Sequence, residues 1–218
     1  MEESGADVGV AHDGDADRVM LVAKDGTEID GDIIEAVCAL DMRDRGILAH
    51  DPVGSTVMCN LGFVKAMEAH GIKVIQTKVG DRYVLEEMRA NGYSIGGEQS
   101  GHMILLEHNS TGDGLMTACQ FLAAVVRSGK TVDQAAQVMT HYPQTLINVH
   151  VRDKHALEGN AEIATAVAAA EADLAGNGRV LIRPSGTEPV VRVMVEASDA
   201  AAAETAAKAI AEVVERVL

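Results

Sequence analysis

Short strand-like runs alternate with helix-like stretches over the first 140 residues, and this alternation limits the fold more than any other feature of the chain. Runs of apolar residues predict strands at 8–11, 18–23, 56–59, 74–79 and 94–97. Stretches with helical periodicity predict helices at 33–45, 63–69, 81–90, 114–126 and 132–140. Alternation at this spacing favours βαβ units, so we expect a mainly parallel, three-layer α/β domain.

The pattern changes near His141-Tyr142-Pro143, because proline disfavours helix at the residue before it. Beyond this point the order strand, helix, strand, strand, helix is predicted at 146–151, 160–174, 179–183, 190–196 and 199–217. This order is typical of a small α+β domain, and we place a domain boundary near residue 141.

The chain carries 33 acidic and 18 basic side chains, a formal net charge of −15. This charge argues against binding to nucleic acids or to anionic membrane surfaces, which a broad positive field would drive. A hydrophobic fraction of 47% supports a buried core, but apolar stretches such as Phe121–Val126 are too short to span a bilayer. The three cysteines are far apart and odd in number, so we expect a reducing, cytoplasmic location.

The segment HDGDADR places three carboxylates, Asp13, Asp15 and Asp17, directly after a predicted strand. Carboxylates this close repel one another unless a cation neutralises them, and hard oxygen ligands suit Mg²⁺ or Ca²⁺. They converge only if the chain turns sharply, which we expect Gly14 to permit. The segment is not an EF-hand, because Arg18 stands where that loop needs glycine. Arg18 indicates that the cation meets a phosphate; the alternative is an acidic, solvated turn.

A second segment, KVGDRY from Lys78 to Tyr83, ends a predicted strand and begins a predicted helix. Backbone N–H groups at the start of a helix, together with Lys78 and Arg82, form a suitable environment for an anion. The alternative is an ordinary helix start, in which Asp81 caps the helix and Arg82 is solvated.

A third segment, GGEQSGH from Gly96 to His102, combines three glycines with polar side chains. Glycines let the backbone approach a ligand closely, and Glu98, Ser100 and His102 are suited to binding sugar hydroxyls and to proton transfer. The alternative is a β-bulge or a hairpin turn. A zinc site of His102 and His108 is not favoured, because no cysteine or third histidine completes the set.

A fourth segment, RPSGTEPVVR from Arg183 to Arg192, places Ser185, Gly186 and Thr187 in a loop between two predicted strands. The N–H and hydroxyl groups of such a loop can surround a phosphate, and arginine adds forked hydrogen bonds. The alternative is a proline-bounded surface loop. Two arginines that bracket the loop favour phosphate binding.

Taken in this order, the four segments resemble the α-D-phosphohexomutase superfamily from about Val8 to the C-terminus, and the second and fourth are most similar to phosphoglucosamine mutases. In that family, four domains surround a cleft. The resemblance implies that residues 1–17 are the last strand and metal loop of a preceding domain. It also implies a sugar-binding α/β domain at 18–140 and a phosphate-binding α+β domain at 141–218.

The resemblance also implies a role for each motif residue. Asp13, Asp15 and Asp17 would bind Mg²⁺, with Arg18 near a phosphoserine and His102 a candidate for proton transfer. The residues implied to contact the sugar and its non-reacting phosphate are Asp81, Arg82, Glu98, Ser100, Arg183, Ser185, Gly186, Thr187 and Arg192.

The implied reaction interconverts glucosamine 6-phosphate and glucosamine 1-phosphate through a bisphosphorylated sugar. In the family the phosphoserine lies in an A-S-H-N-like segment, which this sequence does not contain. We therefore expect a C-terminal part of the enzyme, which binds a phosphosugar weakly, has no mutase turnover alone and needs the missing N-terminal domains as its partner. The sequence is also compatible with a homo-oligomer.

Three alternatives stay open. One is a related mutase that acts on mannose or glucose phosphates, and another is a phosphosugar-binding module without catalysis. The third is a Mg²⁺-dependent phosphatase with Asp13 or Asp15 as nucleophile. The phosphatase is disfavoured, because it does not need separate sugar and phosphate loops.

Overall fold

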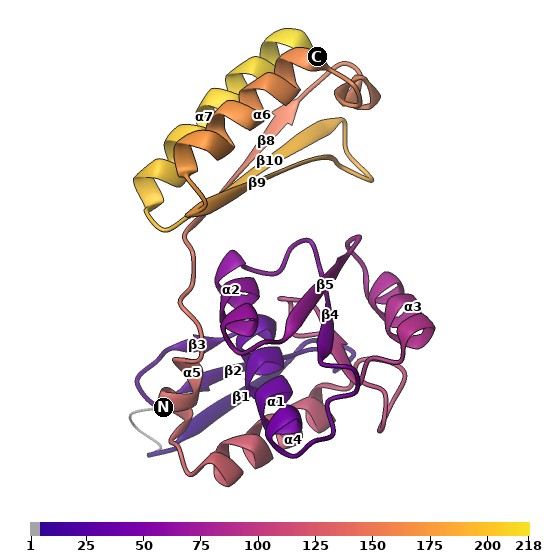
Figure 1. Cartoon of the computed structure of the whole chain (residues 1–218), viewed down its shortest axis with the longest axis vertical. Coiled ribbons are helices and arrows are strands. Elements are labelled where there is room, and N and C mark those ends of the chain that lie inside the picture. Colours follow the sequence, from indigo (N-terminus) through magenta and orange to yellow (C-terminus); the bar gives the residue numbers. More distant parts are fainter. Residues whose placement is uncertain (1–4) are drawn as a thin grey trace. The chain divides into compact units, whose positions relative to one another are not determined.

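The computed structural model describes residues 5–218, which form two compact units, unit 1 ending at Thr140 and unit 2 running from His141 to Leu218. Of the part expected to come from a preceding domain, residues 1–4 lie outside the described range. Figure 1 draws unit 1 in indigo through magenta to salmon, and unit 2 in orange and yellow. Each unit has its own hydrophobic core.

Unit 1 begins with a small antiparallel sheet in the order β1-β2-β3. Its strands are β1 (Val8–His12), β2 (Val19–Ala23) and β3 (Glu28–Ile29). β2 is the central strand, and its Val19 and Leu21 side chains are fully buried, as the alternation of a half-buried strand requires. β3 is too short to show a strand period, so sequence analysis misses it.

The second sheet of unit 1 has the order β5-β4-β6-β7. Its strands are β4 (Pro52–Thr56), β5 (Lys73–Thr77), β6 (Ile95–Gly97) and β7 (Met103–Leu105). β4 pairs in parallel with β5 and β6, whereas β7 pairs antiparallel with β6 and was not expected. The helices that link the parallel strands are α2 (Leu61–Ala69) and α3 (Asp81–Asn91).

Helices cover both faces of this sheet, which confirms the three-layer α/β class. The remaining helices of unit 1 are α1 (Gly31–Asp44), α4 (Gly114–Ser128) and α5 (Val132–Ala136). These three join α2 in the main core, and α3 packs through a separate cluster of Val84, Met88 and Ile104. In Figure 1, α2 and α3 stand on either side of β4 and β5.

The strand expected at 56–59 is wrong, because β4 ends at Thr56. The Thr56 hydroxyl accepts the N–H of Met58, and the N–H of Cys59 donates to the Thr56 carbonyl at 3.1 Å, so the chain turns there. The Asn60 side chain then caps α2 by accepting a backbone N–H at 2.9 Å. Local hydrogen bonds therefore override the strand propensity of this apolar run.

Unit 2 is a three-stranded antiparallel sheet with two long helices, which confirms the small α+β class. Its elements are β8 (Gln144–His150), the 3-10 helix η1 (Lys154–Leu157), α6 (Ala161–Leu174), β9 (Gly178–Pro184), β10 (Val190–Ala197) and α7 (Ala200–Val217). β10 lies between β8 and β9, and its Val191, Val193 and Val195 side chains pack with Ile210 and Val214 of α7.

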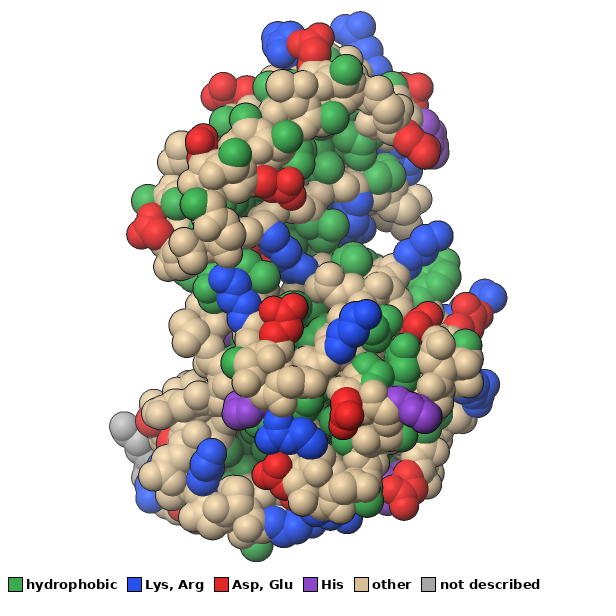
Figure 2. Space-filling model, in the orientation of Figure 1, with side chains coloured by type: hydrophobic (Ala, Val, Ile, Leu, Met, Phe, Trp, Pro, Cys, Tyr) green, Lys and Arg blue, Asp and Glu red, His purple; other side chains and the backbone are tan. Residues whose placement is uncertain are grey.

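None of the helices within residues 5–218 combines the length and the apolar character that crossing a bilayer requires. On the face drawn in Figure 2, acidic and basic side chains are interspersed over unit 1. Side chains of both signs therefore share this face of unit 1.

Two carboxyl groups of α1 lie inside the core of unit 1. Asp32 and Glu35 are both 0% exposed. One Asp32 oxygen accepts the N–H of Asn60 at 2.7 Å, and both Glu35 oxygens are buried. Desolvation, followed by the neighbouring Asp32 charge, raises the pKa of Glu35 well above its usual range. Burial therefore favours the neutral acid at this position.

We predict that Glu35→Gln removes a pH-dependent loss of stability. Because the folded-state pKa of Glu35 is raised, its contribution is fully present below the unfolded pKa of about 4.3 and is lost as pH rises through the folded pKa. Urea unfolding at a series of pH values should show the wild type losing up to about 1.4 kcal/mol per pH unit relative to the variant in that window. Glu28→Gln on β3, which is exposed, is the control. Parallel pH profiles for wild type and Glu35→Gln would contradict the prediction.

A backbone hairpin joins β6 to β7 and touches both β2 and α1. The N–H of Glu98 donates to the His102 carbonyl at 2.9 Å, which closes the hairpin. Gly101 has φ +90°, and a Cβ added there would lie 2.1 Å from the Val19 carbonyl oxygen. A side chain at Gly101 is therefore excluded both by the backbone conformation and by the space.

We predict that Gly101→Ala destabilises unit 1 by about 3 kcal/mol or more, because it adds backbone strain and a main-chain clash. Gly14→Ala is the matched control, since no atom lies within 4 Å of a Cβ placed there. It should change the free energy of unfolding by less than about 1 kcal/mol. Urea denaturation of both variants measures the difference, and similar losses in both would be incompatible with this packing.

Candidate functional site

The aspartate loop follows β1 and turns tightly. The N–H of Ala16 donates to the Asp13 carbonyl at 3.3 Å, and Ala16 has φ +58°. The expectation that Gly14 permits the turn is wrong. The residue with the left-handed backbone conformation is Ala16, and Gly14 does not have a positive φ. Alanine rarely adopts this conformation, so the loop holds a small amount of backbone strain.

The turn brings the carboxylates of Asp13, Asp15 and Asp17 together, with one oxygen of each within 4.8 Å of the others. Desolvation, and then the Asp15 charge, raises the pKa of Asp17, and its Oδ1 is buried without a hydrogen-bond partner among residues 5–218. The Arg18 guanidinium lies 3.8 Å from Asp13. Three hard oxygen ligands this close together fit a Mg²⁺ ion.

His102 lies beside this loop and is almost fully buried. Its Nε2 is 3.5 Å from the Asp17 carboxylate and 3.8 Å from that of Asp81. The N–H of Gly112 donates to the same nitrogen at 3.2 Å, so Nε2 is an acceptor in this arrangement. The first, second and third motifs therefore meet at one imidazole.

Two glycines that sequence analysis did not single out form the wall behind this site. A Cβ on Gly112 would lie 2.4 Å from the His102 ring, and one on Gly114 would lie 2.5 Å from the Arg18 carbonyl oxygen. The N–H of Gly114 also donates to the Ala16 carbonyl at 2.9 Å. The run TGDG at 111–114 was a visible signal for such a close approach.

The second and third motifs also contact each other directly. Glu98 accepts the N–H of Gly80 at 3.1 Å, and Gly80 has φ +127°. Ser100 is exposed in the hairpin turn between β6 and β7. A hairpin turn is the structure that the sequence analysis gave as the alternative to a sugar-binding loop. Arg82 is 80% exposed, and its guanidinium donates to Glu86 one turn along α3. It borders the site but contacts none of the three aspartates among the described residues.

In unit 2, two arginines face each other across neighbouring strands. Arg183 on β9 is the register partner of Arg192 on β10. Desolvation, and then the charge of Arg192, lowers the pKa of Arg183. Arg192 donates to Glu188 at 3.0 Å, but its Nε is buried and without a partner in the described chain. Like charges placed directly opposite are destabilising, and an anion between them would relieve the repulsion.

The loop between these arginines is closed by its own hydrogen bonds. The buried Ser185 donates its N–H to the Val190 carbonyl at 2.9 Å, and its hydroxyl accepts the N–H of Glu188 at 3.3 Å. A Cβ on Gly186 would meet no atom within 4 Å, so the loop is open on that side. The Lys154 ammonium donates to loop carbonyls, a contact that no local sequence signal indicates.

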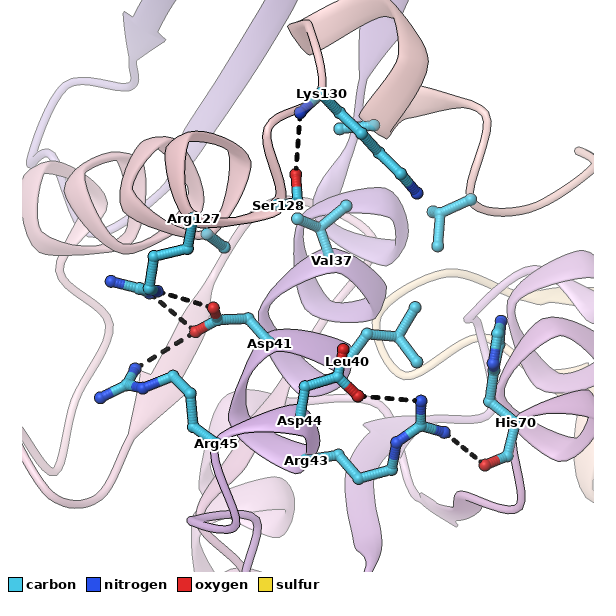
Figure 3. A pocket seen from close by; sticks show the side chains of 13 residues that line it. Val37, Leu40, Asp41, Arg43, Asp44, Arg45, His70, Arg127, Ser128 and Lys130 are labelled. Carbon is cyan, nitrogen blue, oxygen red and sulfur yellow. Dashed lines mark hydrogen bonds and ion pairs between the residues drawn. The ribbon is translucent and has the colours of Figure 1, made fainter.

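A separate hollow of about 380 Å³ lies among α1, α4 and α5 and contains none of the motif residues. Figure 3 shows Arg127 and Arg45 pointing at Asp41 from two sides, with Arg127 contacting both of its oxygens at 2.7 Å. Arg43 pairs with Asp44 at 3.2 Å. These guanidinium groups are already paired with carboxylates of α1, so this hollow is a poor phosphate site.

Two family models and several relatives match this chain. Residues 30–142 match the model of phosphoglucomutase/phosphomannomutase, alpha/beta/alpha domain III, and residues 146–213 match its C-terminal domain. Phosphoglucosamine mutase from Streptomyces coelicolor is 55% identical over 216 residues, which cover 99% of this chain and 48% of that protein. The enzyme of the same name from Brevibacillus brevis is 53% identical over 213 residues, covering 98% and 48%.

Solved structures share the fold. Aspergillus fumigatus N-acetylphosphoglucosamine mutase, in complex with GlcNAc-6P and magnesium, superposes with a TM-score of 0.78 at 21% identity, covering 95% of this chain and 48% of that one. A phosphoglucomutase/phosphomannomutase family protein from Burkholderia thailandensis gives a TM-score of 0.76 at 22% identity, covering 97% and 47%. The chain thus spans about half the length of these relatives. With a family model matching more than half of its residues, the chain belongs to the phosphoglucomutase/phosphomannomutase family.

Proposed function

We propose that the chain supplies the sugar-binding and phosphate-binding parts of a phosphoglucosamine mutase, which interconverts glucosamine 6-phosphate and glucosamine 1-phosphate. One observation carries the proposal: His102 lies within 3.8 Å of both Asp17 and Asp81, so three separate motifs share one site. Three unrelated solvated turns have no reason to converge in this way. The relatives named phosphoglucosamine mutase support the choice of sugar over mannose or glucose.

In this proposal Asp13, Asp15 and Asp17 hold Mg²⁺, which when bound neutralises charge on the transferring phosphoryl group. Arg18 binds the phosphoryl oxygens with forked hydrogen bonds. His102 lies 3.5 Å from the Asp17 carboxylate and is the candidate for moving a proton. These residues form the reacting half of the site.

The sugar and its second phosphate are held by the other motifs. Glu98 and Ser100 bind sugar hydroxyls, and Asp81 and Arg82 border them at the start of α3. The loop residues Ser185, Gly186 and Thr187 bind the non-reacting phosphate between Arg183 and Arg192. Fixing one phosphate orients the sugar for reaction at its other end.

We predict that the 218-residue chain binds glucosamine 6-phosphate but gives no mutase turnover, because its sequence has no A-S-H-N-like segment to carry the phosphoserine. Isothermal titration measures the binding, and a coupled assay for glucosamine 1-phosphate measures turnover. Arg192→Met should weaken binding about tenfold or more, because it removes a charge-assisted contact to phosphate.

Arg216→Met is the matched control for this binding test. Arg216 lies on α7 of the same unit, is 62% exposed and pairs with Glu162, so its loss should leave the affinity within about twofold. Turnover by the chain alone would refute the first half of the prediction. Equal losses in both arginine variants would refute the phosphate site.

We predict that Mg²⁺ raises the melting temperature of the chain and that EDTA reverses the effect, because the ion relieves repulsion among three carboxylates. Asp15→Asn should weaken Mg²⁺ binding about tenfold or more, since it removes a charged ligand. Asp44→Asn, at a residue 73% exposed on α1, is the control and should bind Mg²⁺ like the wild type. An unchanged melting temperature of the wild type at millimolar Mg²⁺ would count against the site.

A further inference from the structure

A single lysine ammonium contacts three carbonyl groups of the loop between β9 and β10. Lys154 Nζ donates to the carbonyl oxygens of Ser185 at 2.7 Å, Glu188 at 3.3 Å and Gly186 at 3.5 Å. Lys154 begins η1, whose first turn is fixed because the Asp153 side chain accepts the N–H of His155 at 2.9 Å. An ammonium has three donors, and this arrangement directs all of them at one loop.

The contact determines which groups the loop presents on its other side. In a trans peptide the C=O and the following N–H point in opposite directions. The carbonyls of Ser185 and Gly186 point at Lys154, so the N–H groups of Gly186 and Thr187 point away from it. Neither N–H donates to another group within the described residues, and no atom lies within 4 Å of a Cβ placed on Gly186. Two free N–H groups therefore face an open side of the loop.

We propose that Lys154 is the positioning residue of the phosphate loop. By holding the loop carbonyls on one side, it presents the N–H groups of Gly186 and Thr187 to a phosphate on the other, next to Arg183 and Arg192. It also keeps carbonyl oxygens, which would repel an anion, turned away from the bound phosphate. This inference rests on the proposed function of the loop, and it adds a residue that touches no substrate.

The test is a titration of the ¹⁵N-labelled chain with inorganic phosphate and with glucosamine 6-phosphate, followed by NMR at the loop amides. In the wild type the Gly186 and Thr187 amide signals should shift on binding. Lys154→Met should weaken binding about tenfold or more and abolish those two shifts, because hydrogen bonds to a charged group contribute substantially. Lys154→Arg keeps the charge and the donors and should bind more tightly than Lys154→Met.

Lys208→Met is the matched control, since Lys208 is 62% exposed on α7 and pairs with Glu204. It removes the same charge without a loop contact and should leave the affinity within about twofold. If Lys154→Met loses the amide pattern of β9 and β10, Lys154→Gln, which keeps polar hydrogens without the charge, serves for the same comparison.

The outcomes separate the two ideas. If the wild type shows no phosphate-dependent shift in the loop, the proposed function of the loop fails, and the inference fails with it. If the wild type binds and Lys154→Met binds equally well with the same amide shifts, only the role of Lys154 is overturned. A weakening in Lys208→Met equal to that in Lys154→Met also overturns it, because net charge alone would then explain the effect.

Discussion

A main-chain contact between the two sheets of unit 1 holds the candidate site together. The N–H of Val19 donates to the Gly101 carbonyl at 3.2 Å, and the N–H of Gly31 donates to the Gln99 carbonyl at 3.0 Å. The hairpin is thus held between β2 and the start of α1. The contact residues Gly31 and Gly101 are glycines, because a Cβ at either position would clash with the facing main chain. Because β2 continues directly from the aspartate loop, the same clamp sets Asp17 beside His102 at the end of the hairpin. The position of the aspartate loop therefore depends on the hairpin that carries Gly101 and His102.

Each unit concentrates charges of one sign at its candidate binding loop. Unit 1 gathers three carboxylates, and unit 2 sets Arg183 opposite Arg192. By contrast, Asp41 of α1 is paired with two arginines. Like charges gathered in one place cost stability, so these two clusters are candidate sites for an external ion of opposite charge.

Much of this arrangement was predictable, because each motif lies at the end of a strand. The strands that end at the first residue of a motif, or within one residue of it, are β1, β5, β6 and β9. Strand ends are readable from apolar runs and turn residues. The position of β4 was not predictable, because side-chain hydrogen bonds of Thr56 and Asn60 turn the chain inside an apolar run. Lys154 and Gly112 were also missed, since their partners lie far away in sequence and no local pattern encodes such contacts.

The left-handed alanine in the aspartate loop has a consequence for how a cation would be received. Glycine at that position would give the loop many backbone states, and the carboxylates could drift apart whenever no ion is present. Ala16 confines the loop to a narrow well near φ +58°, so the repulsion is met during folding and not at the moment of binding. A cation bound at this loop would therefore meet carboxylates whose backbone is already ordered.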